Sequence, residues 1–184
     1  MQAMKALGLA LGILCMSTSS HAGTGALNPF VTFNSELMAA GVNAALYATL
    51  KKGESPQTVA CAVPLTPNVL YPHVLKAITA GIPADDLAEL NKFFATPTGE
   101  LFAKMLITYG YHKYGLPSPY GEPVQNDEQI AETKQFQAKY MDAMKRAMSV
   151  SSAVSTTDAV ADVKKTFDSC KASTTTAAST TGSH

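Results

Sequence analysis

The sequence has few of the residues and motifs that carry out chemistry. It contains only four histidines, and it lacks a Gly-x-Ser-x-Gly elbow, a His-Glu-x-x-His pair and a glycine-rich phosphate-binding loop. Its three cysteines form no Cys-x-x-Cys pair, so neither a zinc site nor a thiol-redox motif is indicated. Catalysis needs convergent groups with tuned protonation. We therefore predict that the protein is not an enzyme and holds no metal or cofactor.

The histidines leave room for one alternative. His73 follows a proline near the start of an expected helix, where a general acid–base role is conceivable and an exposed structural position is favoured. His112 lies in a polar stretch typical of a solvated loop, and His184 belongs to the tail. No second group is placed by the sequence beside any of them, so the enzyme hypothesis has no constellation to support it.

Long hydrophobic runs are also scarce, and the one at the amino terminus is short. Lys5 and the terminal amine supply a positive end, an apolar run extends from Ala6 to Met16, and Ser20-His21-Ala22 presents small residues to a signal peptidase. We expect residues 1–22 to be a signal peptide that is cleaved after Ala22. The mature protein would then be periplasmic or secreted.

Two alternatives to a cleaved signal are open. A membrane anchor is disfavoured because the apolar run is shorter than the roughly 20 residues that span a bilayer. A lipoprotein attached at Cys15 is disfavoured because Leu14 stands where alanine or glycine is usual. We expect no membrane span after cleavage.

The chain lacks an excess of either charge. Fourteen basic residues face fourteen acidic ones, and Lys5 leaves with the signal, so the mature net charge is close to −1. A strongly basic surface is what binds nucleic acid or an anionic membrane. Neither is expected as a partner.

Removal of the signal also changes the cysteine count. Cys15 leaves, and Cys61 and Cys170 remain as an even pair in a compartment where disulfides persist. We expect them to form one disulfide, with two separate buried thiols as the alternative. In the chain-entropy model, closing a loop of about 110 residues contributes about 4 to 5 kcal/mol.

Apolar residues recur at helical spacing along most of the chain, and sustained alternation typical of strands is missing. The fold class is therefore predicted as all-α, a compact bundle of about five to seven helices with one disulfide. We expect an irregular lead over residues 23–34, one helical domain over 35–171, and a disordered Ser/Thr/Ala-rich tail over 172–184.

Caps and breakers divide this domain. Ser55, Thr66 and Thr96 each precede a proline, the pattern of a hydroxyl N-cap with proline at the first helical position. Asn126 with Gln129 resembles a capping box. Helices are expected over residues 35–51, from 56, over 66–80 and 83–94, from 96, from 126, and over 157–171.

One long loop interrupts the helical period, from Gly110 to Val124. Tyrosine offers a large rigid contact area with a hydroxyl, and proline reduces the cost of ordering a loop on binding. This stretch is a candidate partner-binding loop, and a lid that packs its tyrosines over the core is the alternative. Its candidate residues are Tyr109, Tyr111, His112, Tyr114 and Tyr120.

Residues 85–100 read DDLAELNKFFATPTGE. This block resembles a bacterial family of exported helical proteins of unknown function, in which an acidic helix ends in an aromatic pair and Thr-Pro-x-Gly opens the next helix. Phe93, Phe94, Thr96, Pro97 and Gly99 match that pattern, whereas Glu100 stands where the family usually has lysine. The resemblance implies a periplasmic helical fold and names no activity. The same residues suit a tight helix corner, because the threonine caps, the proline fixes φ and the glycine permits close approach.

The functional prediction follows from these points. We expect a non-enzymatic protein-binding module, such as an inhibitor, an immunity factor or a chaperone-like protein, whose partner is another envelope or secreted protein. The alternative is a carrier of a small ligand or of copper, since thioethers select Cu(I) and Met141, Met144 and Met148 share a helical face. Their spacing is also that of an ordinary core stripe, which is favoured.

Overall fold

The computed structural model describes residues 28–152 and 157–180. The predicted signal peptide, residues 1–22, and the first part of the expected lead, residues 23–27, lie outside the described residues. Over the described ranges no helix is both long and apolar enough to cross a membrane.

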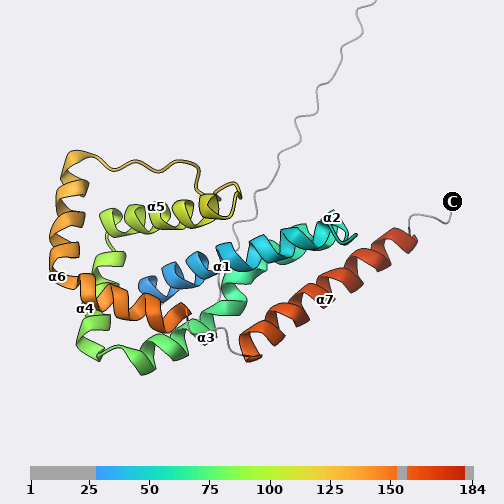
Figure 1. The fold of residues 1–184 in the computed structure, drawn as a ribbon, viewed down its shortest axis with the longest axis horizontal. Helices are drawn as coiled ribbons and strands as arrows, with labels where there is room; N and C mark the ends of the chain where they lie inside the picture. The colour runs from blue at the N-terminus through green and yellow to red at the C-terminus, as the bar shows by residue number, and fades with distance from the viewer. Residues whose placement is uncertain (1–27, 153–156, 181–184) are drawn as a thin grey trace, which may run out of the picture.

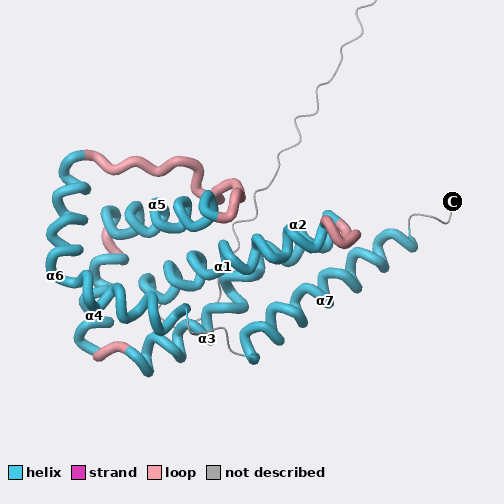
Figure 2. Tube along the Cα trace, in the orientation of Figure 1, coloured by secondary structure: helices cyan, strands magenta, loops and turns pink. Residues whose placement is uncertain are grey.

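The described residues form seven α-helices and one 3-10 turn, with no strand, which confirms the all-α prediction (Figures 1 and 2). In chain order these elements are α1 (Pro29–Leu50), α2 (Pro56–Ala62), η1 (Val63–Leu65), α3 (Thr66–Gly81), α4 (Ala84–Phe94), α5 (Pro97–Lys113), α6 (Asp127–Ser152) and α7 (Thr157–Thr180).

Helix α1 is the centre of the arrangement. Figure 1 shows α5 along one side of α1 and α3 along the other, and α1 also contacts α2, α4 and α6. Its first turns carry Phe30, Val31 and Phe33, all almost completely buried in the main core. Because neighbours surround this helix on several sides, its amino-terminal half has few solvent-facing positions.

The expected irregular lead over 23–34 is wrong for residues 29–34, which are helical. The side chain of Asn28 accepts a hydrogen bond from the Val31 N–H at 3.1 Å, and Asn91 of α4 accepts one from the Phe30 N–H at 3.1 Å. These contacts satisfy amides that a helix start leaves unpaired. Apolar residues do not show a clear helical spacing in residues 29–34, because side chains on most faces of this part of α1 are buried.

Helix α3 also begins differently from the prediction. Thr66 is not an N-cap, since its hydroxyl donates to the Ala62 carbonyl at 3.2 Å and the backbone continues from α2 through η1 without an extended residue. Pro72 lies within α3 and does not end it.

The capping box at the start of α6 is confirmed. The Asn126 N–H donates to Gln129 Oε1 at 3.0 Å, and the Gln129 N–H donates to Asn126 Oδ1 at 2.9 Å. Farther along α6 the side chains of Phe136 and Met144 are buried, whereas Met148 is 40 % exposed. The predicted buried stripe on this helix therefore does not include Met148.

Helix α7 continues to Thr180, so the prediction of a disordered tail from residue 172 is wrong for residues 172–180. This stretch contains neither glycine nor proline, so no residue in it forces the helix to end. The Thr174 hydroxyl also lies 3.1 Å from that of Thr58 on α2. Residues 181–184 of the predicted tail lie outside the described residues.

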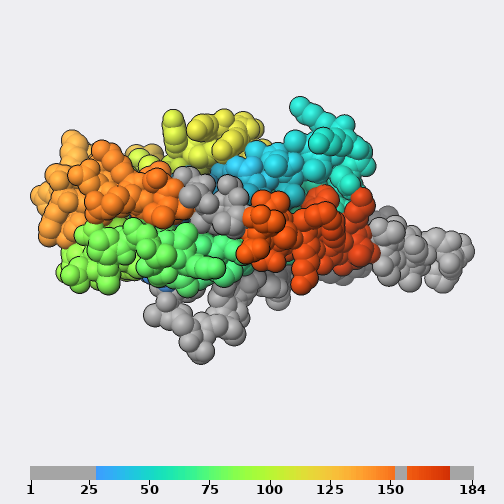
Figure 3. All heavy atoms as spheres, turned by 60° about the horizontal axis from the view of Figure 1, so that its bottom comes forward, coloured from blue at the N-terminus to red at the C-terminus, as the bar shows by residue number. Residues whose placement is uncertain are grey.

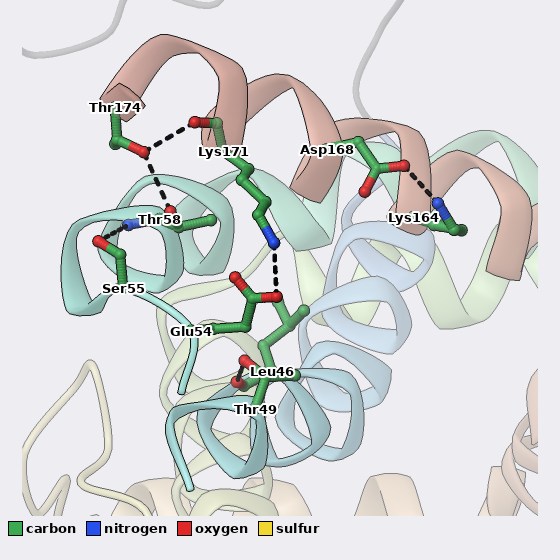
Figure 4. A network of polar contacts seen from close by, with 9 residues as sticks. All are labelled: Leu46, Thr49, Glu54, Ser55, Thr58, Lys164, Asp168, Lys171 and Thr174. Carbon is green, nitrogen blue, oxygen red and sulfur yellow. Dashed lines mark hydrogen bonds and ion pairs between the residues drawn. The ribbon is translucent and has the colours of Figure 1, made fainter. Parts of the chain in front are cut away.

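The expected disulfide is present: Cys61 of α2 is bonded to Cys170 of α7. Around it lies a small second core that contains Leu46, Val59 and the half-buried Phe167. In Figure 3, α7 (red) lies against α2 (cyan) and α3 (green). Figure 4 shows Lys171 reaching from α7 to Glu54, with 2.7 Å between the ammonium nitrogen and the carboxylate oxygen.

Candidate functional site

The predicted tyrosine loop is shorter than expected, because α5 continues through Lys113. Gly110, where the loop was expected to begin, lies inside this helix. An added Cβ on Gly110 would lie 2.8 Å from Leu37 Cδ1, so this glycine permits close packing of α5 on α1 rather than a turn. Tyr109, Tyr111 and His112 consequently lie on the helix, and the loop covers residues 114–126.

The structure separates the predicted loop residues. Tyr111 is buried and its hydroxyl accepts a hydrogen bond from Asn43 of α1 at 3.0 Å, with burial raising the pKa of the phenol. Tyr114 lies over Gly41 of α1, with its hydroxyl within 3.1 Å of where a Cβ would stand. Tyr120 also reaches α1, whereas Tyr109 is 71 % exposed. Tyr111 therefore belongs to the core, whereas Tyr114 and Tyr120 contact α1 with side chains that stay 50 % and 37 % exposed.

His112 remains near the loop. Its Nε2 lies 3.2 Å from the Glu122 carboxylate, and both side chains are largely exposed. The other described histidine, His73 of α3, contacts Asp162 of α7 at 2.9 Å. These two contacts join elements at separate places in the fold and do not converge on one site.

Glu36 of α1 is the acceptor for the Tyr120 hydroxyl. Its carboxyl is partly buried, and it forms no ion pair with any residue that the structure describes. Burial raises the pKa of Glu36, while the hydrogen bond from Tyr120 and the more distant Lys104 act in the opposite direction. Burial and the nearby Glu36 carboxylate raise the pKa of Tyr120. Tyr120 therefore stays protonated and donates to Glu36 at neutral pH.

A hollow of about 320 Å³ lies between α1, α5 and the loop, and we call it the α1–α5 hollow. Phe33 and Phe94 contribute to its lining, and their ring centroids lie 4.8 Å apart. Its charged residues are Glu36, Glu100 and Lys104, so its lining carries one more negative than positive charge.

A second hollow, of about 500 Å³, lies between α1 and the start of α3, and we call it the α1–α3 hollow. Pro64, Pro67 and Tyr71 line the side opposite α1. Thr32 and Glu36 line both hollows, so the two adjoin along one face of α1. We call the two hollows together with Tyr120 the recognition face.

The sequence-predicted helix corner lies beside this face and builds the core. The Thr96 hydroxyl accepts a hydrogen bond from the Gly99 N–H at 3.0 Å, which is the expected cap. A Cβ on Gly99 would lie 2.0 Å from the Phe93 carbonyl oxygen, so only glycine fits. The ring of Phe93 stacks on Phe136 of α6 with centroids 3.7 Å apart. Phe94 faces the core, and Pro97 opens α5.

A third hollow, of about 400 Å³, lies between α4 and α6 over Phe93. Its charges are balanced, with Glu89 and Glu132 facing Lys92 and Lys139. Tyr140 donates to Glu89 at 2.7 Å, and this bond lowers the pKa of that carboxyl. Because its charges compensate one another, this hollow attracts a charged ligand less strongly than the α1–α5 hollow does.

The methionines of the copper alternative do not share one environment. Met144 is 4 % exposed, whereas Met148 is 40 % exposed. Over the ranges that the structure describes, no cluster of three or more His, Cys, Asp or Glu side chains is placed to hold a metal ion.

Comparison of the chain with known protein families, curated proteins and solved structures gave no match. The resemblance of residues 85–100 to an exported helical family thus stays a prediction.

Sequence reasoning found Tyr120 and missed Glu36. A signal for Glu36 is present in the sequence, because it is the only charged residue between Asn28 and Leu50. A single carboxylate in an otherwise uncharged helix is a candidate functional group, since placing it in a partly buried position costs free energy.

Proposed function

We propose that this protein is a non-enzymatic protein-binding module of the periplasm or of the extracellular space, and that it binds its partner through the recognition face. The observation that carries the proposal is Glu36, a partly buried carboxylate at the junction of two hollows. Such a group destabilises the folded protein, and costs of this kind are typical of functional sites.

The shape of the face supports a protein partner. Both hollows are partly open to solvent, and together they extend across α1 from Tyr71 on α3 to Tyr120 on the loop. A small-ligand carrier would surround most of its ligand in a closed cavity. A face lined by aromatic and prolyl side chains suits a segment of another protein instead.

The proposed location rests on two further points. The Cys61–Cys170 disulfide is suited to an oxidising compartment. Residues 85–100 resemble an exported helical family, and this resemblance implies export. The copper-carrier alternative stays a prediction, supported only by the methionines of α6.

Photo-crosslinking in the native compartment tests this function. p-Benzoylphenylalanine in place of Tyr120 should give an adduct of one discrete mass, because its ring lies at the edge of the α1–α5 hollow. The matched control replaces Tyr109, which is exposed and lies two residues from the buried Tyr111, about 200° around α5. Position 109 should give no such adduct. The proposal fails if position 120 gives no adduct, or if both positions give the same one.

A further inference from the structure

We propose that the partner presents an arginine whose guanidinium group binds Glu36 in the α1–α5 hollow. This inference rests on the proposed protein-binding function and names the chemistry of the partner.

The charges of the hollow leave one carboxylate without a cation. The Lys104 ammonium lies 2.7 Å from the Glu100 carboxylate, so these two groups compensate each other. Glu36 receives a hydrogen bond from Tyr120 but has no ion-pair partner in the described part of the chain. A single positive charge from a partner would therefore pair with Glu36 and balance the charges of the hollow.

The wall of the hollow suits a guanidinium group. Tyr120 is 37 % exposed, and its ring already has a cation, the Lys104 ammonium, at 5.8 Å from its centroid. A guanidinium group stacks on aromatic rings and donates two parallel hydrogen bonds to a carboxylate. The apolar floor that contains Phe33 and Phe94 limits solvent screening of such a pair.

The residues next to the arginine would cross α1 into the second hollow. Thr32 and Glu36 line both hollows, so a chain leaving the α1–α5 hollow over Thr32 reaches the wall formed by Pro64, Pro67 and Tyr71. This wall is uncharged and includes two prolines and a tyrosine. It suits an apolar residue of the same segment.

Nuclear magnetic resonance of the exported, disulfide-bonded protein tests the inference with a defined probe. Titration with Ac-Gly-Gly-Arg-Gly-Gly-NH2 should shift the amide resonances of Thr32, Glu36 and Lys104 in a saturable manner. The same peptide with citrulline, which has the shape of arginine without its charge, should bind at least ten-fold more weakly. Equal binding of the two peptides would overturn the inference.

Two variants complete the test. Glu36→Gln should weaken arginine-peptide binding at least ten-fold, and glutamine still accepts the Tyr120 hydrogen bond, so the fold is retained. The matched control is Glu122→Gln, which removes an exposed carboxylate outside both hollows and should leave the Kd unchanged. Unchanged binding to the Glu36→Gln protein would overturn the inference, as would peptide-free shifts at these residues that grow with protein concentration, because a second copy would then fill the hollow.

The two proposals fail in distinguishable ways. A crosslink at position 120 without arginine-peptide binding would show that the face binds a partner by other chemistry, and would remove the arginine. Arginine-peptide binding without a crosslink would remove the protein-binding function.

Discussion

Replacing Gly99 with alanine is expected to lower the free energy of unfolding by about 3 kcal/mol, at the upper end of what overpacking usually costs. The added Cβ would stand 2.0 Å from the Phe93 carbonyl oxygen and 2.8 Å from the Phe94 Cα. Both are backbone atoms, so α4 and α5 would have to separate at their corner. Urea denaturation measures the free energy, and the melting temperature should fall by roughly 10 °C.

Gly41→Ala is the matched control for this corner. Gly41 also lies inside a helix, but the nearest atom to its added Cβ is the hydroxyl of Tyr114 at 3.1 Å, at the end of a half-exposed side chain. Alanine in a helix interior is favoured over glycine by about 1 kcal/mol. This variant should be as stable as the parent or more stable. A similar loss in both variants would show that the close approach at Gly99 is not what matters.

Removing the disulfide is expected to have the largest effect on stability. In the chain-entropy model, a bond between residues 109 apart contributes about 4 to 5 kcal/mol. The double variant Cys61→Ala, Cys170→Ala should lose about that amount in urea denaturation. Helix α7 should lose protection in hydrogen exchange first, because the disulfide lies in the small core, including Leu46 of α1 and Val59 of α2, on which the second half of α7 packs.

The ion pair between α7 and Glu54 offers a control for the disulfide. Lys171→Ala removes this pair, in which the lysine side chain is 54 % exposed, and should cost less than about 1 kcal/mol. If the double cysteine variant costs no more than Lys171→Ala, the disulfide is not what holds α7 in place.

Local rules predicted much of the fold. The caps at Thr96 and Asn126 were predictable because their partners lie three residues away and need no tertiary information. The Cys61–Cys170 disulfide followed from counting alone, once Cys15 was assigned to the signal. These features depend on chemistry that short sequence patterns report directly.

Features set by distant contacts were not predictable. The start of α1 at Pro29 depends on Asn91 of α4, and the position of Gly110 in a helix depends on Leu37 of α1. The composition of residues 172–180 is typical of disorder, and the structure places a contact from Thr174 to α2 in this stretch.

The candidate site also depends on contacts between residues far apart in the sequence, so it could be predicted only in part. Tyr120 stood out in the sequence as part of a tyrosine-rich loop, but its role depends on Glu36, which lies 84 residues earlier in the chain. Pro67 was predicted only as the opening of a helix, and the fold shows that it lines a hollow beside Glu36 together with Pro64. The recognition face is therefore a property of the assembled helices.

The pKa of Glu36, followed by carboxyl carbon resonances with and without the arginine peptide, tests the central claim most directly. Besides burial, the groups that act on this pKa are Tyr120 and Lys104, and Glu100 lines the same hollow. In the free protein, burial should hold the pKa above its ordinary value, and a bound guanidinium should lower it because a cation favours the ionised carboxylate. Peptide affinity should accordingly rise as pH increases through that raised pKa. A pKa of Glu36 that does not move when the peptide is added would contradict the account.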